Sequence, residues 1–227
     1  MRKEGLTMQY TSRCESPLGG ILLAADETGL TGLWLQKQKS FALSLDKAYE
    51  TRELPVPAET KRWPDICFSG REPDFCPPLH FTGSAFRNEV WELLCGIPYG
   101  GTTTYGELAA RPARKRSRPA SAAGPPARPS HMSAQAVGGA VGKNRISLLV
   151  LCRRAVGSNG SLTGCAGGIG KKIRLLEPEG AMRDTFFVPK KSAGAYPEGK
   201  RPPCGVYPRG GLFQTLQNSD LIQSTRL

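Results

Sequence analysis

Cys152 is the residue whose surroundings could support covalent chemistry. It follows the apolar run 146–150 and precedes Arg153 and Arg154, with a glycine-rich loop at 157–170 after them. Cationic neighbours lower the pKa of a thiol, whereas apolar burial raises it. From these neighbours alone, Cys152 is either a reactive nucleophile or a small residue of the core.

Tyr105 is a second candidate, at the predicted start of a helix. Thr103 or Thr104 can cap a helix that begins near Tyr105. On spacing alone, the simplest interpretation of this tyrosine is an aromatic residue packed on the core.

The segment 133–142 has the length of a helix but consists almost entirely of small residues. Each glycine costs about 1 kcal/mol in a helix interior, so several of them need a reason. Tight packing against another helix is one reason, and close contact with a smooth partner such as a nucleic-acid groove is another. Together with the helix near Tyr105, the segment has the layout of a helix-turn-helix.

The remaining elements would position these residues. Residues 8–36 predict a β-meander, 41–50 a short helix, and 81–100 a helix with one apolar face. Residues 58–68 would form a helix if Pro64 did not break or kink it. We expect no chemistry in residues 1–80, which have the pattern of a scaffold.

Composition and charge indicate a soluble, basic, cytoplasmic protein. The net charge of +12 over 227 residues favours a polyanionic partner, nucleic acid before a membrane surface. The sequence has no apolar run of about 18 residues and no signal peptide, so we expect no membrane association. The seven cysteines form no CxxC pair, which predicts reduced thiols and no metal site.

Two segments are predicted to lack a packed core. Residues 111–131 combine several prolines with basic residues and no acidic residue, which indicates a flexible basic loop. Residues 192–227 are rich in proline, glycine and basic residues without periodicity, and we expect them to be a disordered tail.

From about Pro77 to Gly180, the chain resembles the catalytic domain of the O6-alkylguanine-DNA alkyltransferases, also called methylated-DNA–protein-cysteine methyltransferases. Residues 8–80 resemble the smaller N-terminal domain of bacterial members. The matching blocks occur in the family's order and nearly its spacing. They are 83–87, Val90-Trp91, Ile97-Pro-Tyr-Gly100, Thr104-Tyr-Gly-Glu-Leu-Ala109, Ala136-Val-Gly-Gly-Ala140, Asn144, Cys152-Arg153-Arg154, 160–164, 166–168, Leu175-Leu176 and Glu179-Gly180.

The resemblance implies an α/β (α+β) chain of two domains. A small three-layer ribonuclease-H-like domain would occupy residues 8–76. A mainly helical, winged-helix-like DNA-binding catalytic domain would occupy residues 77–191. Members of the family act on double-stranded DNA that contains alkylated guanine. We therefore expect a monomer that needs no cofactor and accepts an alkyl group from the O6 of guanine, or the O4 of thymine, once per molecule.

The resemblance also implies roles for single residues. Cys152 would be the alkyl acceptor, and Tyr105 would donate a proton to the departing base. Asn144 would hold the active-site turn, and Glu179 would end the activating relay. Gln135 would wedge into the base stack from the second helix of the helix-turn-helix, and small residues of that helix would enter the minor groove. The expected DNA-binding residues are Gln135, Ala136, Gly138, Gly139, Ala140, Arg154 and Lys172.

Three positions depart from the family pattern. Arg153 replaces the histidine that passes on the thiol proton, Cys165 replaces a tyrosine of the substrate loop, and Arg145 replaces a proline. An arginine stays protonated and cannot act as a base, although its fixed charge could favour a thiolate and pair with Glu179. Three hypotheses follow: an active alkyltransferase, a lesion-binding protein without transfer, or a general DNA-binding module with a structural cysteine.

Overall fold

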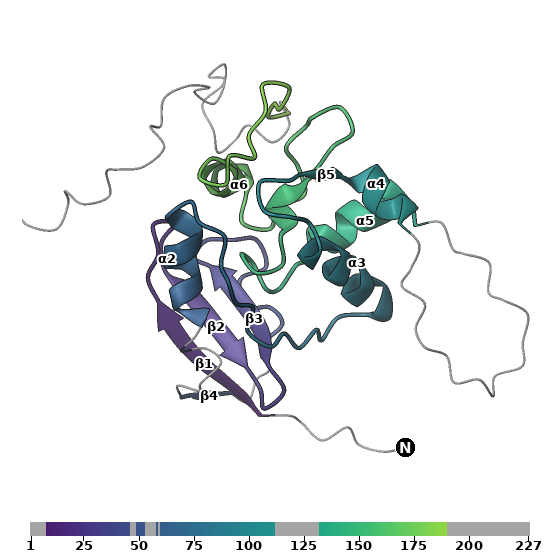
Figure 1. The fold of residues 1–227 in the computed structure, drawn as a ribbon. Coiled ribbons are helices and arrows are strands. Elements are labelled where there is room, and N and C mark those ends of the chain that lie inside the picture. The colour runs from purple at the N-terminus through teal and green to yellow at the C-terminus, as the bar shows by residue number, and fades with distance from the viewer. Residues whose placement is uncertain (1–7, 46–48, 53–57, 59, 112–131, 190–227) are drawn as a thin grey trace, which may run out of the picture.

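The protein has a mixed α/β fold, with a small sheet at its N-terminal end and helices in its C-terminal half (Figure 1). The computed structural model describes residues 8–45, 49–52, 58, 60–111 and 132–189. The predicted mixed class is confirmed, while the ribonuclease-H-like and winged-helix-like descriptions stay predictions. The predicted basic loop, Arg111 excepted, and the predicted tail lie outside the described residues. Within the described ranges, no helix is long and apolar enough to cross a membrane.

The N-terminal sheet confirms the predicted meander. Its strands are β1 (Gln9–Cys14), β2 (Ile21–Ala25), β3 (Leu30–Leu35) and β4 (Tyr49–Thr51), in the order β3-β2-β1-β4. Strands β1 to β3 are antiparallel, and β4 pairs parallel with β1. Side chains alternate along a strand, so Leu23 faces the main core while Leu22 packs with Trp34 on the other face.

One prediction for the N-terminal half was wrong. Residues 41–45 form turns, because Ser40 and Ala42 take positive φ angles that end any helical run, and the predicted helix gives way to β4. The predicted break near Pro64 is confirmed, since helical residues at 58 and 60 are followed by a turn at Lys61 before the next helix begins. Helix α2 (Arg62–Phe68) places Pro64 in its first turn, where a backbone N–H has no partner within the helix anyway.

The C-terminal half contains the three helices predicted within 81–100, near Tyr105 and at 133–142, and a fourth after them. They are α3 (Ala85–Cys95), α4 (Tyr105–Ala110), α5 (Ala134–Val141) and α6 (Ile169–Leu176), with the 3-10 turn η1 (Cys152–Arg154) and the short parallel strands β5 (Thr103–Thr104) and β6 (Ala155–Val156). Thr104 and Glu107 form a reciprocal capping box at the start of α4, and the Ser133 hydroxyl accepts a hydrogen bond from the backbone N–H of Ala136 at the start of α5.

One hydrophobic cluster joins the two halves. It includes Leu33 of the sheet, Trp63 of α2, Trp91 of α3, Val137 of α5 and Val150 before η1. Helix α5 packs against both α3 and α4, as a helix-turn-helix requires. The division into domains 8–76 and 77–191 stays a proposal, in which the two domains share this core.

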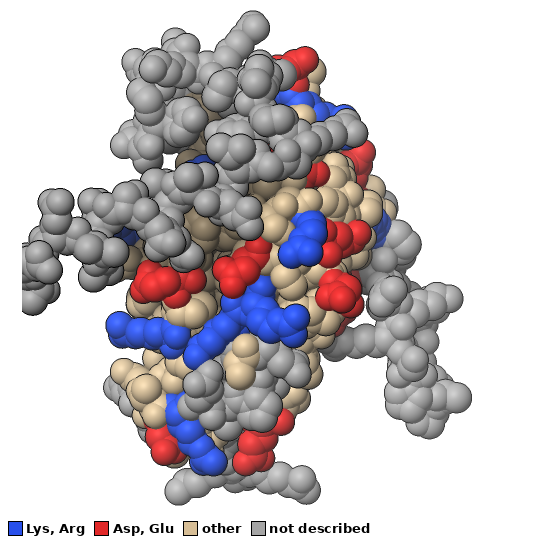
Figure 2. All heavy atoms as spheres, turned by 60° about the vertical axis from the view of Figure 1, so that its left-hand side comes forward, with Lys and Arg blue, Asp and Glu red and all other residues tan. Residues whose placement is uncertain are grey.

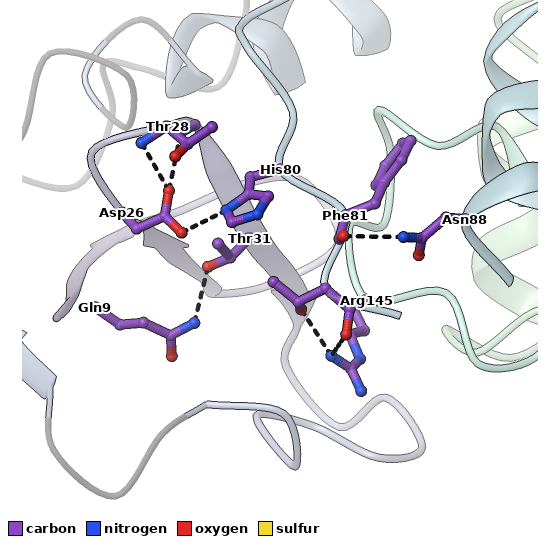
Figure 3. A network of polar contacts seen from close by, with 10 residues as sticks. Gln9, Asp26, Thr28, Thr31, His80, Phe81, Asn88 and Arg145 are labelled. Carbon is purple, nitrogen blue, oxygen red and sulfur yellow. Dashed lines mark hydrogen bonds and ion pairs between the residues drawn. The ribbon is translucent and has the colours of Figure 1, made fainter. Parts of the chain in front are cut away.

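The segment that connects the two halves, residues 78–80, is hydrogen-bonded to Leu30 at the edge strand β3. The backbone N–H of Leu30 donates to Pro78 O at 2.8 Å, and that of His80 donates to Leu30 O at 2.9 Å. Asp26, in the turn before β3, accepts from the backbone N–H groups of Thr28 and Gly29 and pairs with His80 Nδ1 at 2.5 Å (Figure 3). The buried carboxylate thus fixes both the turn and the connecting segment.

Arg145, which stands where the family pattern has a proline, makes a second tie to this segment (Figure 3). Its guanidinium donates to the carbonyl and hydroxyl oxygens of Thr82 at 3.0 and 2.8 Å. Its own carbonyl accepts from Leu33 N, and Ser147 N donates back to Leu33 O. The chain that leads to Cys152 is therefore anchored to the sheet and to the start of α3.

Replacing Asp26 with alanine tests the first tie. We expect Asp26→Ala to lower the free energy of unfolding by about 1–3 kcal/mol, since two backbone N–H donors, one of them buried, and His80 lose their acceptor. Urea denaturation measures the change. Glu27→Ala is the matched control, because Glu27 is exposed and should shift stability by no more than about 0.5 kcal/mol. Equal effects of the two substitutions would contradict the assignment.

Candidate active site

Cys152 begins η1, directly after a tightly held turn. Asn144 spans that turn: its Nδ2 donates to Val150 O at 3.0 Å, and its Oδ1 accepts from Ile146 N at 2.9 Å. Asn144 is itself buried, so water has little access to the groups that form these two hydrogen bonds. Asn144 thus bridges the two ends of the turn before Cys152, and its role in the site stays a prediction.

The thiol of Cys152 lies among groups that favour its ionised form. The Cys165 Sγ lies 3.9 Å from the Cys152 Sγ. A hydrogen bond from Cys165 lowers the pKa of Cys152 to about 6, against the effect of burial, and Asn144, Lys172 and Arg153 lower it further. The pKa of Cys165 is raised by the same hydrogen bond and by burial. At neutral pH, Cys152 is therefore the thiolate of the pair and Cys165 the thiol.

Glu179 neutralises two buried arginines beside this thiol. Its Oε1 accepts from Arg153 Nε at 2.6 Å, and its Oε2 accepts from Arg154 Nε at 2.8 Å. Arg154 also donates to Ile97 O and lies over the ring of Tyr99. The sequence-based suggestion that Arg153 could pair with Glu179 agrees with this geometry.

Arg153 has a structural role besides its charge. Its Nη1 donates to the carbonyl of Leu148 at 2.6 Å, and Leu148 has a φ of 73°, a left-handed conformation that costs a leucine of order 1–3 kcal/mol. Such a conformation persists only where neighbouring contacts fix it. Arg153 therefore holds the turn before Cys152 and cannot accept a proton from it.

Cys67 is a site neighbour that sequence reasoning missed. It lies on α2, in the half expected to have no chemical role, and its Sγ is 3.6 Å from Arg153 Nη2. Burial raises the pKa of Cys67, so it is a neutral thiol. No local pattern around residue 67 indicates this contact, which joins residues 86 positions apart.

Tyr105 lies at the start of α4 with its hydroxyl turned inward. Burial raises the pKa of Tyr105, and its hydroxyl donates to Thr163 O at 2.7 Å. Cys152 and Cys165 lie close to this hydroxyl and raise the pKa of Tyr105 further. Gly164 fits beside this hydroxyl because it has no side chain: a Cβ there would lie 2.3 Å from the Tyr105 oxygen. Tyr105 is thus a protonated group next to the thiol pair.

The outer surface of α5 is open. Gln135, Ala136 and Gly139 are exposed and Gly138 is half-buried. A Cβ placed on Gly138 or Gly139 would meet nothing within 4 Å. Packing against another helix therefore does not explain these glycines, and close contact with a partner surface remains as the explanation.

Three predicted DNA-binding residues need correction. Ala140 faces the core, and its carbonyl accepts from Trp91 Nε1. Arg154 is held inside by Glu179. Lys172 is fully buried, and its ammonium donates to the carbonyls of Ala155 and Thr163. None of the three presents a group to the surface, because their partners lie within the protein.

Charge on the surface is mixed on at least one side. Figure 2 shows the face brought forward from the left of Figure 1, where basic and acidic side chains lie side by side. The basic side chains across the middle of that face lie directly next to acidic ones. The candidate contact surface for a polyanion is α5, because its outer side is open at Gly138 and Gly139.

Several known proteins are similar to this chain in sequence and in fold. A family model described as 6-O-methylguanine DNA methyltransferase, DNA binding domain, matches residues 85–181. A methylated-DNA–protein-cysteine methyltransferase of Methanosarcina acetivorans is 37% identical over 172 residues, covering 76% of this chain and 99% of the relative. One from Mycobacterium leprae is 33% identical over 178 residues, covering 76% and 93%. The crystal structure of Mycobacterium tuberculosis OGT in complex with DNA has a TM-score of 0.59 and 30% identity, covering 77% of this chain and 93% of that chain.

The thiol pair predicts an unusual titration. The ultraviolet absorbance of the Cys152 thiolate, taken as the difference from a Cys152→Ser variant, should appear with a midpoint near pH 6 and be lost below it. Cys165→Ala removes the hydrogen bond and should move the midpoint up, toward about 8.5, the value of an ordinary thiol. Cys165→Ser keeps a donor and should stay near the wild type. A wild-type midpoint above 8 would rule out this description.

The arginine pair predicts a large stability effect at Glu179. Glu179→Gln leaves two buried guanidinium groups without a negative partner, so we expect a loss of about 3–5 kcal/mol in the free energy of unfolding. Glu177→Gln, two residues away and only half-buried, should change stability by about 0.5 kcal/mol or less. Chemical denaturation compares the two variants, and a small effect at position 179 would show that the pair is not stabilising.

Proposed function

The chain belongs to the family of methylated-DNA–protein-cysteine methyltransferases, and from this premise we propose that it repairs DNA by direct alkyl transfer. An alkyl group on the O6 of guanine, or the O4 of thymine, would move to the sulfur of Cys152. The observation that carries the proposal is the setting of Cys152, a buried thiol whose pKa is lowered to about 6 beside a protonated tyrosine.

The transfer step balances with the groups present. The Cys152 thiolate supplies an electron pair to the alkyl carbon, and the carbon–oxygen bond breaks toward the base. Tyr105 is protonated at neutral pH, as a tyrosine ordinarily is, and burial raises its pKa further. It can donate the proton that the departing base takes up, and the tyrosinate would then regain a proton from solvent. The product is a thioether, and the described residues offer no group that would remove it. Each molecule would therefore act once, without a cofactor.

Arg153 changes how the thiol is activated. A histidine relay would collect the thiol proton during the reaction, whereas Arg153 stays protonated and paired with Glu179. In this protein the thiol would ionise before the substrate binds, because Cys165, Asn144, Lys172 and Arg153 stabilise the anion. Its proton would go to solvent.

The proposed partner is double-stranded DNA that contains the alkylated base. Helix α5 would enter the minor groove with its open glycine surface, and exposed Gln135 would fill the space left by the flipped base. Extrusion of a base costs a few kcal/mol, which contacts along the groove must offset. The reduced state of the described cysteines fits a cytoplasmic location, and we include that location and a monomeric state in the proposal.

Mass spectrometry of the full-length protein tests the proposal. After incubation with duplex DNA containing O6-methylguanine, Cys152 should have gained one methyl group, in at most one copy per molecule. Cys152→Ser should gain none, and Cys95→Ser, which removes an exposed thiol outside the site, should be methylated like the wild type. An unmodified Cys152 in protein fully bound to the DNA would refute transfer.

The Arg153→His variant separates the two remaining roles of the fold. If the wild type binds methylated duplex in preference to undamaged duplex without transfer, and Arg153→His then transfers the methyl group, the protein is a lesion-binding protein. Equal affinity for both duplexes with an inert Cys152 would instead identify a general DNA-binding module.

A further inference from the structure

Two cysteines of the site are neighbours although the sequence separates them by 13 positions. Cys152 lies on η1, and Cys165 lies in the loop between β6 and α6, with 3.9 Å between their sulfur atoms. A disulfide needs about 2.05 Å, so the sulfurs would have to approach by roughly 2 Å. Position 165 is also one of the three departures from the family pattern, which has a tyrosine there.

The loop of Cys165 is the part that can move. Cys152 is fixed by the Asn144 turn, whereas Cys165 is only partly buried and is followed by Ala166 and then by two glycines. Gly168 has a φ of 87°, and a Cβ there would meet no atom within 4 Å, so this end of the loop is not packed. A shift of Cys165 toward Cys152 acts on two backbone hydrogen bonds of this loop, from Gly168 N to Cys165 O and from Lys39 N to the carbonyl of the buried Ala166.

The two thiols differ in the way that stepwise oxidation requires. Cys152 is the anionic partner, beside the buried cations Lys172 and Arg153, and Cys165 keeps its proton. Both residues line a small cavity, together with Ser147 and Gly167, with room for about one water-sized molecule. Cys67 is another thiol near the site, but burial raises its pKa and it does not line this cavity, which it approaches only through its contact with Arg153.

We propose that Cys165 is a resolving cysteine, which converts peroxide-oxidised Cys152 into a reversible Cys152–Cys165 disulfide. The inference rests on the proposed function only for its consequence, because the oxidation itself requires the two thiols alone.

The chemistry proceeds in two balanced steps. The Cys152 thiolate attacks one oxygen of a hydroperoxide, the O–O bond breaks, and the sulfur becomes a sulfenic acid while water or an alcohol leaves after taking up a proton. The Cys165 thiol then attacks the sulfenic sulfur, the S–O bond breaks, and water leaves as the disulfide forms. Two electrons pass from the thiol pair to the peroxide, and a thiol reductant returns them.

The disulfide would protect a residue that can be used only once. While it is present, Cys152 cannot form a thiolate, which is the nucleophile that attacks the alkyl group, so transfer stops. Further oxidation of Cys152 to a sulfinic acid, which would be permanent, is also blocked. Reduction restores the acceptor.

Peptide mapping without reductant tests the proposal on the full chain. Trypsin cuts after Arg153 and Arg154, so the two cysteines fall on different peptides. After treatment with hydrogen peroxide, we expect the intact protein to lose two hydrogens and the peptides of Cys152 and Cys165 to be joined. Methyl transfer to O6-methylguanine DNA should be abolished, and dithiothreitol should restore both the mass and the transfer.

Two variants serve as controls. Cys165→Ser should form no cross-link, and its Cys152 should gain two oxygen atoms as a sulfinic acid that dithiothreitol does not reverse. Cys95→Ser should cross-link like the wild type. A wild type that is oxidised to the sulfinic acid with Cys165 still free, or that joins Cys152 to a different cysteine, would overturn the proposal.

The readouts distinguish failure of this inference from failure of the proposed function. A cross-link in a protein that never accepts a methyl group supports the resolving cysteine and refutes alkyl transfer. Methyl transfer without any cross-link does the reverse. Protein methylated on Cys152 beforehand should form no cross-link, and a cross-link there would also overturn the inference.

Discussion

The carboxylate of Glu179 is the interaction on which the site depends. It is buried and pairs with two guanidinium groups, so it compensates charges that would otherwise be too costly to place inside the protein. Through Arg153 it is linked to the turn before Cys152 and to Cys67 on α2, and through Arg154 to the end of α3. The segments that contain Leu148, Cys67 and Ile97 are thereby tied to one buried carboxylate.

This arrangement separates two tasks that a histidine would combine. Arg153 provides position and a constant positive charge, but it takes no part in proton transfer. The protonation state of Cys152 is instead set by its nearest neighbours, with Cys165 contributing most and Lys172 adding a buried ammonium. The buried ammonium of Lys172 is stabilised because two backbone carbonyls accept hydrogen bonds from it. The site is therefore tuned by fixed charges and a second thiol.

Much of the C-terminal half could be predicted because its signals are local. Thr104 with Glu107 and Ser133 mark helix starts within four residues, and the structure uses both. The errors over single site residues have a common cause, which is that burial depends on distant segments. Lys172 has the pattern of a surface cation on a basic helix, yet the fold encloses it. The region of Cys67 offers no motif at all, and its contact with Arg153 exists only once α2 packs on the sheet.

The bare surface of α5 has a consequence for how the proposed repair protein would search a genome. At Gly138 and Gly139 the helix has no donor or acceptor beyond its backbone with which to distinguish one base pair from another. Neighbouring sequence would then hardly affect residence time, and the molecule could inspect every step of the duplex on nearly equal terms. What it would sense is how easily a base leaves the stack, so that a weakened pair, and not a sequence, would be the signal it stops for.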